Sequence, residues 1–518
     1  MDYTKSFILL GIMLSLIACG QSGNTGKDQT SSALWFQQGK EKVQQRKLFL
    51  EKEQENESSR KAKNIIFVVG DGMGVSTLTA ARIFVGQQQG LLGEEFALSF
   101  ESFPHTALIK TYNVDLQTPD SAGTMSALMT GLKTNEGIIS LPASVKRGDC
   151  TSTTLQDKML PTLLDIAKAK GKSTAVVTTA RVTHATPATT YAHSVDRNWE
   201  SDDAIPQEAK DLGCLDIASQ LIADNGTSVD MILGGGRRHF LPSTEGGKRL
   251  DGKNLISQWQ SQGGQYVASL TDLQQLATAN GEHKETAKEK KPVLGLFSSS
   301  HLSYAYQRAE STSNQPSNEQ PSLQQMTEAA LNRLQKNDQG YALIIEAGRI
   351  DHGHHEGKAY KALTETQELH ETIAWLMTQV DIKETLIVVT ADHSHTLTLS
   401  GYATRGNPIL GHVVGNDREG YPQTAPLKDK QGNPYTILSY RDGPGANIER
   451  DHDGHGEQHK KQDKQLNDPD YQQIALVPMD YETHGGEDVA LYAIGPQAQL
   501  FSGTLEQHWV FHALKYAM

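Results

Sequence analysis

Acidic and hydroxyl side chains lie at the ends of several short apolar segments of this sequence. Asp71, Glu346 and Asp392 each end or closely follow such a segment, Thr186 comes shortly after another, and His393 directly follows Asp392. Carboxylate, hydroxyl and imidazole groups are the side chains that bind divalent cations. If the segments are strands of one sheet, we expect their ends to form a single metal-binding site.

A histidine-rich segment at 348–356 adds further candidate ligands. If this segment opens a helix, Asp351 and His355 are four residues apart and face the same way, while His352 and His354 point elsewhere. His484 lies near the start of a later apolar segment. We therefore expect Asp351 and His355 to bind one metal ion together with His484.

The chemistry of these groups sorts them between two kinds of metal. Imidazole with carboxylate suits zinc, whereas a set of oxygen atoms completed by water suits magnesium. The predicted sets are Asp351, His355 and His484 for one zinc ion, Asp71, Asp392 and His393 for a second zinc ion, and Asp71, Thr186 and Glu346 for one magnesium ion. Asp71 would bridge two of the sites.

Ser121 is the candidate nucleophile. It follows Pro119 and precedes a run of small residues, a pattern typical of a helix start, where backbone N–H groups favour a bound phosphate. An ordinary capping serine would give the same pattern. Because a serine hydroxyl is a weak nucleophile, a catalytic role for Ser121 requires a nearby metal ion to ionise it.

A charge balance favours a phosphate ester as the substrate. Three divalent cations, four carboxylates, an ionised Ser121 and the guanidinium of Arg197 leave two net positive charges at the predicted site, which a phosphate dianion would neutralise. Arg197 can offer two parallel N–H donors to two phosphate oxygens. We expect Arg197 to hold the phosphate group of the substrate.

The elements that must position these residues follow an α/β pattern. Short apolar runs occur at 65–69, 173–178, 229–233, 342–345, 386–390 and 489–494, with helical patterns between several of them, such as 162–170 and 326–334. This alternation predicts a large, mostly parallel central sheet with helices on both faces. Ligands bind at the carboxyl edge of such sheets, which is where the candidate residues lie.

The N-terminal region carries the signature of an exported lipoprotein. Residues 1–18 have one lysine followed by an apolar run too short to span a bilayer comfortably, which is typical of a signal peptide. Small residues precede Cys19, the predicted lipidation site, although a cleaved signal with an unrelated cysteine is the alternative. We expect an outer-membrane lipoprotein that faces the periplasm or the cell surface and is held there by the N-terminal lipid alone.

The rest of the chain divides by composition. Residues 19–63 are predicted to be a lipidated tether and an N-terminal helical arm, either loosely docked or clasping a second subunit. A catalytic α/β domain is expected at 64–400 and 483–518. The region 401–482, rich in Gly, Pro, Asn and Asp, is predicted to be an inserted crown-like subdomain beside the site.

The bulk composition limits the classes of function. With 37% hydrophobic and 21% charged residues, the chain resembles ordinary globular proteins, and a net charge of −13 argues against a nucleic-acid-binding surface. Apart from Cys19, the cysteines are Cys150 and Cys214. In an exported chain this even pair indicates one disulfide, with two separate buried thiols as the alternative.

Together these segments resemble the alkaline phosphatase family, particularly its animal-type branch. The motifs are GDGMGVS at 70–76, PDSAGT at 119–124, VTHATP at 182–187, GRIDHGHHE at 348–356, ADH at 391–393 and ETHGGED at 482–488. The resemblance runs from about residue 64 to the C-terminus. It implies a homodimeric hydrolase of small phosphate monoesters with two zinc ions and one magnesium ion.

The resemblance also implies roles for individual residues. Ser121 matches the nucleophile that forms a phosphoserine intermediate, and Arg197 matches the residue that holds the phosphate. His184 matches a position near magnesium, outside the ligand set. Cys150 and Cys214 match a disulfide of the animal-type branch.

Two departures from the family pattern matter. Ser298 follows Phe297 where animal-type enzymes have an acidic calcium ligand, so a calcium site is not expected. The insertion matches the family only at its ends, and its histidine-rich segment 451–459 is either a solvated loop or an accessory metal site. His395 resembles a family histidine that lies near the metal ligands, and it is assigned no coordinating role. His193, His301, His370 and His412 are interpreted as structural or surface residues.

Two alternative functions follow from the same residues. A phosphodiesterase or sulfatase on the same metal scaffold is one, but diesterases usually lack the magnesium set that Thr186 and Glu346 complete here, and sulfatases need a Cys-x-Pro-x-Arg motif that is absent. The other is a non-catalytic lipoprotein that binds zinc or phosphate. That function would predict the loss of Ser121 or of a ligand, and none is missing.

Overall fold

The computed structural model describes residues 61–518 apart from 152–155, 224–228, 280–290, 310–318, 447, 451–456 and 460–464, together with residues 37, 40, 41, 43, 44 and 48. The latter six are helical, in the region where an N-terminal helical arm was predicted. The predicted signal peptide and Cys19 lie outside the described residues. Within the described part, no helix is long and apolar enough to cross a membrane.

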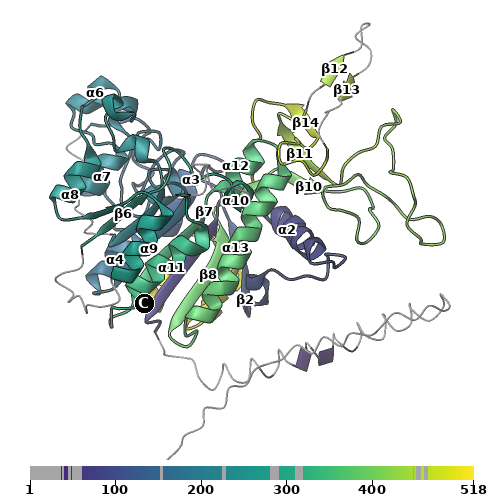
Figure 1. The fold of residues 1–518 in the computed structure, drawn as a ribbon, viewed down its shortest axis with the longest axis horizontal. Helices are drawn as coiled ribbons and strands as arrows, with labels where there is room; N and C mark the ends of the chain where they lie inside the picture. The colour runs from purple at the N-terminus through teal and green to yellow at the C-terminus, as the bar shows by residue number, and fades with distance from the viewer. Residues whose placement is uncertain are drawn as a thin grey trace, which may run out of the picture. The chain divides into compact units, whose positions relative to one another are not determined.

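A ten-stranded sheet organises the unit Arg60–Met518 (Figure 1). Its strands are β1 (Asn64–Gly70), β2 (His105–Lys110), β3 (Ser173–Arg181), β4 (Met231–Gly235), β5 (Gln265–Val267), β6 (Val293–Leu296), β7 (Tyr341–Ala347), β8 (Thr385–Ala391), β16 (Val489–Ile494) and β17 (Gly503–Glu506). Their spatial order is β17-β2-β16-β8-β1-β7-β3-β4-β6-β5. Among these strands β16 alone runs antiparallel to its neighbours, so the predicted mostly parallel sheet is confirmed.

The central strands are mostly apolar because both faces of the sheet are covered. Six of the seven residues of β1 are buried, and all seven residues of β7 and of β8 are buried. Near-continuous Val and Ile runs, without polar alternation, are expected for strands buried on two sides. The register places Val69 of β1 beside Glu346 of β7, and Gly70 beside Ala391 of β8. The carboxyl ends of three strands therefore lie level with one another.

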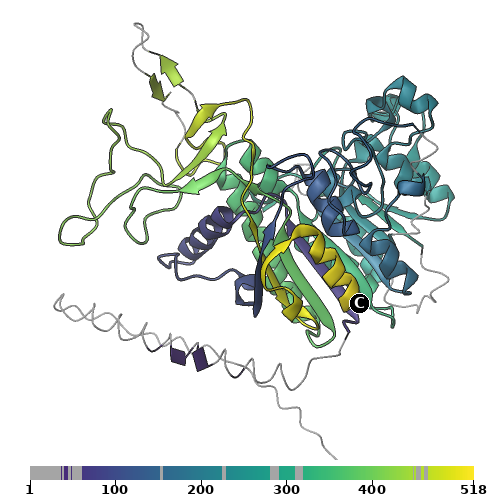
Figure 2. The same cartoon turned by 180° about the vertical axis from the view of Figure 1, so that it is seen from behind.

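Helices cover both faces of the sheet, as predicted. On one face α11 (Leu323–Leu334) and α13 (Ala359–Gln379) pack together, and on the other α3 (Ser121–Thr130), α4 (Leu163–Ala169) and α14 (Gln507–Ala517) do so (Figure 2). Within 61–518 the other described α-helices are α2 (Val75–Gln88), α5 (Ala185–Ala188), α6 (Gln207–Asp211), α7 (Ile217–Ala223), α8 (Leu255–Ser261), α9 (Leu270–Ala279), α10 (Ala305–Ala309) and α12 (Arg349–His355).

The region 401–482, together with β10 just before it, carries strands that do not join the main sheet. A three-stranded sheet combines β10 (Leu397–Leu399), β11 (Leu438–Gly443) and β14 (Ala475–Pro478), and β12 (Ile448–Arg450) pairs with β13 (Glu457–His459). A third pairing joins β9 (Ser394–His395) to β15 (His484–Gly485). This pairing joins the segment that follows β8 to the segment that follows the region 401–482.

A smaller apolar cluster lies apart from the main core and includes Ile138, Val195 and Trp199. Cys150 is buried in this cluster, and Cys214 packs against it. The two cysteines form a disulfide, as predicted. The disulfide closes a chain segment of 64 residues and so restricts the unfolded state.

Candidate metal centre

Three carboxylates meet at the carboxyl edge of the central strands. Asp71 directly follows β1, Glu346 is the sixth residue of β7, and Asp392 directly follows β8. All three are buried, with at most 1% of their surface exposed. One ligand atom each from Asp71, Asp392 and His393 lies within 4.8 Å of the others, and the same holds for Asp71, His184 and Glu346. The predicted convergence of the strand ends is therefore observed.

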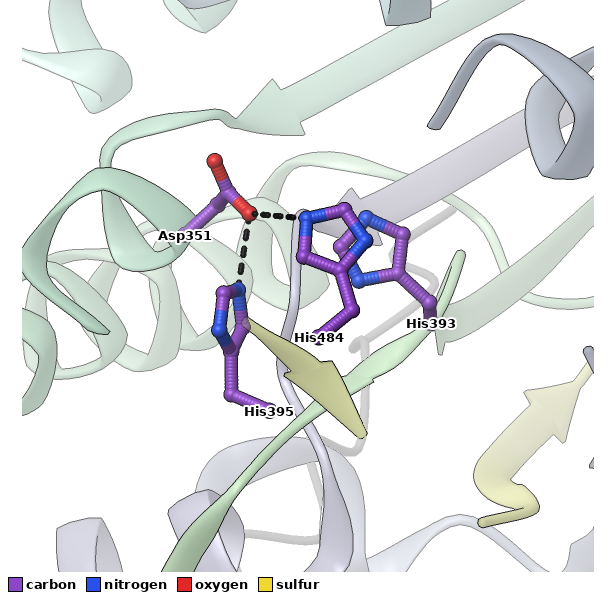
Figure 3. A group of neighbouring side chains, drawn as sticks. All are labelled: Asp351, His393, His395 and His484. Carbon is purple, nitrogen blue, oxygen red and sulfur yellow. Dashed lines mark hydrogen bonds and ion pairs between the residues drawn. The ribbon is translucent and has the colours of Figure 1, made fainter. Parts of the chain in front are cut away.

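Asp351, His355 and His484 form a nearly equilateral group. Asp351 Oδ1 lies 3.3 Å from His355 Nε2 and 3.4 Å from His484 Nε2, and the two imidazole nitrogens are 3.2 Å apart. Zinc bonds of about 2.0–2.1 Å in a tetrahedron place neighbouring ligand atoms about 3.3 Å apart. Figure 3 shows Asp351 facing the His484 ring. These three atoms thus have the spacing of one face of a zinc tetrahedron.

Backbone carbonyl groups set the orientation of both histidines. Nδ1 of His484 donates to the carbonyl of Pro119 at 2.8 Å, and Nδ1 of His355 donates to the carbonyl of Glu482 at 2.6 Å. A proton on Nδ1 leaves the lone pair on Nε2, which is the form of imidazole that binds a metal. Both Nε2 atoms face Asp351, so the predicted ligands are held in the correct tautomer.

His393 lies at the centre of the second group. Its Nε2 is 3.4 Å from Asp71 Oδ1, 3.4 Å from Asp392 Oδ2 and 2.9 Å from Ser121 Oγ. Asp392 Oδ1 is held by the backbone N–H groups of Gly72 and His393, at 3.1 and 2.9 Å. The other carboxylate oxygen, Oδ2, lies beside His393 Nε2 and accepts from the hydroxyl of Thr124 at 3.3 Å.

The electrostatics of this edge favour bound cations. Burial, together with Asp392, Asp351 and Glu346, raises the pKa of Asp71 well above its usual value. Burial also raises the pKa of Glu346, to about 8, although hydrogen bonding from Thr178 opposes the shift. Carboxylates packed this closely repel one another unless a cation or a proton lies between them.

Several buried oxygen atoms at this edge have no hydrogen-bond partner among the described residues. They are both carboxylate oxygens of Asp71, Oε1 of Glu346 and Oγ1 of Thr186. Buried polar atoms without partners are rare in proteins, and an ion bound in the native protein is one explanation for them. Each residue of the oxygen-only set predicted for magnesium thus has at least one oxygen without a hydrogen-bond partner in the described part of the chain, and the residues fit a divalent cation.

Ser121 is the first residue of α3, and the helix is capped by Asp120. The Asp120 carboxylate accepts from the backbone N–H groups of Ala122 and Gly123. The alternative that Ser121 is an ordinary capping serine is therefore wrong, because Asp120 has that role. Ser121 is 1% exposed and its hydroxyl faces His393 instead. The start of α3 brings its partial positive charge to the same point.

Arg197 is held beside Ser121 by the capping carboxylate. Its Nη1 donates to Asp120 Oδ2 at 3.0 Å, and its Nη2 lies 3.4 Å from His184 Nε2. Asp120 also accepts from Asn113 and from the backbone of Gly137, so its position is fixed from several sides. The structure therefore brings Arg197 and the serine helix together across 77 residues of sequence. Sequence reasoning missed Asp120, whose signal was its place before a helix start.

Three half-buried histidines pack their rings together next to the predicted magnesium site. The ring centroids of His301 and His352 are 4.0 Å apart, and His184 lies 5.4 and 5.5 Å from them. Burial, together with Arg181 and Arg197, lowers the pKa of His184 to about 3, so this ring is neutral. His301, interpreted from the sequence as a structural or surface residue, is half-buried and contacts His184 and His352.

His395, which was predicted to lie near the site without coordinating a metal, contacts Glu482, to which sequence reasoning gave no role. His395 Nε2 lies 2.7 Å from Asp351 Oδ1, and its Nδ1 lies 2.5 Å from Glu482 Oε2. Burial alone would lower the pKa of His395, but the two carboxylates raise it to about 10. The ring belongs to a cluster with Asp351, His393 and His484 (Figure 3). Because both of its nitrogens donate to carboxylates, it has no lone pair for a metal.

Comparison with known proteins agrees with this geometry. A sequence model of the family described as alkaline phosphatase matches residues 62–518. The tissue-nonspecific isozyme of alkaline phosphatase from Rattus norvegicus is 41% identical over 98% of this chain and 93% of its own length, and that from Homo sapiens is 41% identical over 88% and 83%.

Solved structures show the same fold at lower sequence identity. The alkaline phosphatase of Thermus thermophilus gives a TM-score of 0.60 at 23% identity, covering 89% of this chain and 92% of that one. The enzyme of the Antarctic bacterium TAB5 gives 0.58 at 19% identity, covering 88% and 98%. The family match over nearly the whole described unit and the full-length relatives lead to one conclusion: this chain belongs to the alkaline phosphatase family and is a metal-dependent phosphomonoester hydrolase.

Proposed function

We propose that the enzyme hydrolyses phosphate monoesters through a phosphoserine at Ser121, with two zinc ions and one magnesium ion held by the predicted ligand sets. The observation that carries the proposal is the position of the Ser121 hydroxyl, 2.9 Å from His393 Nε2, beside two groups of predicted ligands. Ligand atoms in these groups are 3.2–3.4 Å apart, the spacing expected around zinc.

The residues fit the metals as follows. Asp351, His355 and His484 would hold one zinc ion, Asp71, Asp392 and His393 the second, and Asp71, Thr186 and Glu346 magnesium. Cations bound there would favour ionisation of the serine hydroxyl and neutralise charge that develops on the phosphate oxygens.

The chain's own groups supply the nucleophile and the phosphate-binding contacts. Ser121 Oγ would attack phosphorus, forming the Oγ–P bond as the bond to the ester oxygen breaks and the alcohol leaves with a proton. Water would then break the Oγ–P bond, releasing inorganic phosphate and restoring the hydroxyl. Two displacements of this kind retain the configuration at phosphorus.

Arg197 would bind the phosphate during both steps. Its guanidinium lies in the buried polar region beside the start of α3, where Asp120 fixes Nη1. Planar N–H donors match the spacing of two phosphate oxygens. The backbone at the start of α3 adds the partial positive charge of a helix N-terminus. The enzyme would thus recognise its substrate mainly through the phosphate group and less through the alcohol.

We also propose export as a lipoprotein anchored through Cys19, and assembly as a homodimer. The disulfide between Cys150 and Cys214 supports an oxidising compartment, since such bonds persist outside the cytosol. Labelling with a radioactive fatty acid should mark the wild-type protein and spare a Cys19→Ser variant. Light scattering of the unlipidated protein should give twice the chain mass, and a monomer mass would contradict the dimer.

The test of the proposed function combines metal analysis with turnover. Purified enzyme should contain about two zinc ions and one magnesium ion per chain, and should hydrolyse a phosphate monoester much faster than the matching diester. Ser121→Ala should lower kcat by several orders of magnitude, because the covalent step is lost. Acid-quenched wild-type enzyme should carry phosphate on Ser121 by mass spectrometry.

A second serine of α3 provides the control for Ser121→Ala. Ser126→Ala removes a buried hydroxyl of the same helix that bonds to the carbonyl of Ile138, away from the ligand groups, and should retain activity. Full activity in Ser121→Ala would exclude the phosphoserine mechanism. A preference for the diester would indicate a phosphodiesterase instead.

A further inference from the structure

We propose that Glu482 is a positioning residue that fixes the Asp351 side of the predicted zinc site through His355 and His395. The inference rests on the proposed assignment of Asp351 and His355 as zinc ligands. Glu482 is fully buried, and no part of it is needed as a ligand in the proposed sets. Its contacts instead reach the two imidazole rings that face Asp351 Oδ1 from different sides.

The carboxylate of Glu482 holds His395. Oε2 accepts from His395 Nδ1 at 2.5 Å, while Oε1 accepts from the backbone N–H and the hydroxyl of Thr396, both at 2.6 Å. Three donors thus converge on one buried carboxylate. A carboxylate is the side chain that can accept from all three, because it has two acceptor oxygens and no donor.

His395 transmits this constraint to Asp351. With Nδ1 bound to Glu482, its Nε2 lies 2.7 Å from Asp351 Oδ1 (Figure 3). The ring is buried and both nitrogens are committed, so it cannot rotate without losing a hydrogen bond to a carboxylate. The orientation of the Asp351 carboxylate is therefore set by a residue that itself contacts no predicted metal.

The backbone of Glu482 holds His355 at the same time. Its carbonyl accepts from His355 Nδ1 at 2.6 Å, and its N–H donates to the His355 carbonyl at 2.9 Å. This reciprocal pair closes the last turn of α12 against the chain segment that precedes β15. One residue therefore fixes the tautomer of a predicted ligand and, through His395, the orientation of its neighbour.

Glu482 is in turn anchored to β11. Thr483 donates from its backbone N–H and its hydroxyl to the Asp442 carboxylate, at 2.9 and 3.0 Å. Gly443 has φ +133°, and a Cβ there would lie 3.1 Å from Glu482 Cβ. The close approach of the two segments thus requires glycine. Through this contact the region 401–482 contributes to the geometry of the predicted zinc site.

The inference predicts a specific effect on zinc retention. Residues that hold metal ligands in place typically account for 10- to 100-fold in metal affinity. Glu482→Gln keeps the shape and the backbone contacts, but its amide nitrogen cannot accept from His395 or Thr396. We expect zinc to dissociate about 10- to 100-fold faster from this variant, measured by transfer to a chromogenic chelator in excess.

Two further variants distinguish the positioning of the zinc ligands by Glu482 from a general effect on folding. Thr396→Val removes one donor to Glu482 and keeps the backbone one, so zinc loss should be faster than in the wild type but slower than in Glu482→Gln. Glu487→Gln is the matched control, since Glu487 follows five residues later and bonds to Ser394 Oγ at 2.6 Å. It should release zinc at the wild-type rate.

Thermal unfolding of the metal-free proteins is the second readout. We expect zinc to raise the melting temperature of Glu482→Gln less than that of the wild type. If the variant releases zinc as slowly as the wild type, the inference is wrong, and Glu482 supports folding alone. If Glu482→Gln does not fold, the order of release rates for Thr396→Val and Glu487→Gln decides the question. A wild-type protein that binds no zinc would contradict the proposed function itself.

Discussion

The histidines of the candidate site differ in which ring nitrogens are already occupied. His355 and His484 each donate from Nδ1 to a backbone carbonyl, which leaves Nε2 for a metal. His395 uses both nitrogens on carboxylates and is therefore a cationic support for Asp351. Histidine therefore serves at this site both as a predicted metal ligand and as a residue that positions a ligand. The partners of each ring, which the sequence does not reveal, decide between the two roles.

A substitution of Arg197 tests the phosphate contact by itself. Arg197→Ala removes a charged donor that the structure holds with Asp120, and should lower kcat/KM for a monoester by about 10- to 100-fold, because a hydrogen bond to a charged group is worth about 1.5–3 kcal/mol. Steady-state kinetics with metal analysis of the same sample measure this. Zinc content should stay at the wild-type level, and its loss would show that Arg197 supports the metal sites instead.

Sequence spacing could predict part of the site because some ligands are local. The i, i+4 pair Asp351 and His355 follows from helix geometry, and Asp392 with His393 follows from a strand end. The approach of His484 could not be predicted in this way. It depends on the ladder between β9 and β15, which pairs His484 with His395 across 89 residues of sequence.

At the scale of elements, all six strands expected from apolar runs are present in the main sheet, as β1, β3, β4, β7, β8 and β16. The strands that were not predicted are β2, β5, β6 and β17. Three of these have only three or four residues, too few for a periodic pattern to be distinguished from a loop. The fourth, β2, alternates buried and exposed residues and pairs with the antiparallel strand β16 on one side.

The end of β3 is fixed by a buried ion pair that should make stability depend on pH. Glu200 accepts from Arg181 Nε and Nη2 at 2.7 and 2.6 Å, and from Thr183 Oγ1 at 2.6 Å. Burial alone would raise the pKa of Glu200, but Arg181 dominates together with His239 and lowers it to about 2. Its charged form is therefore favoured in the folded state.

The sign of the effect follows from linkage. A carboxyl whose folded pKa is lowered stabilises the protein above its unfolded pKa, and this contribution is lost as pH falls toward 2. We expect Glu200→Gln to lower the free energy of unfolding by about 3 kcal/mol near pH 6, with the difference from wild type shrinking below pH 4. Urea unfolding at several pH values measures it, and a difference that does not vary with pH would contradict the ion pair.

At the scale of the whole molecule, the predicted ligands extend from Asp71 to His484, over most of the unit Arg60–Met518. A fragment of the chain shorter than 71–484 would therefore lack at least one of the predicted ligands. Metal binding should therefore stabilise the folded unit as a whole, since an unfolded chain does not bring these residues together. The carboxylates of Asp71, Glu346 and Asp392 are buried close together at the strand edge, and they repel one another when no cation is bound.

Chelation tests this coupling between metal and fold. Dialysis against a strong chelator should abolish monoester hydrolysis and lower the melting temperature, and zinc with magnesium should restore both. An ion present at a thousand times its Kd contributes about 4 kcal/mol to the free energy of unfolding. Calorimetry of the metal-free and reloaded protein measures the change. Activity that survives complete metal removal would contradict a metal-dependent mechanism.

Anomalous X-ray scattering at the zinc absorption edge tests the central claim most directly, because it locates the ions in the folded protein. The account predicts two strong zinc peaks, one about 2.0–2.1 Å from the Nε2 atoms of His355 and His484 and one at that distance from Nε2 of His393 and close to Ser121 Oγ. Zinc peaks elsewhere, or none in an active crystal, would contradict it.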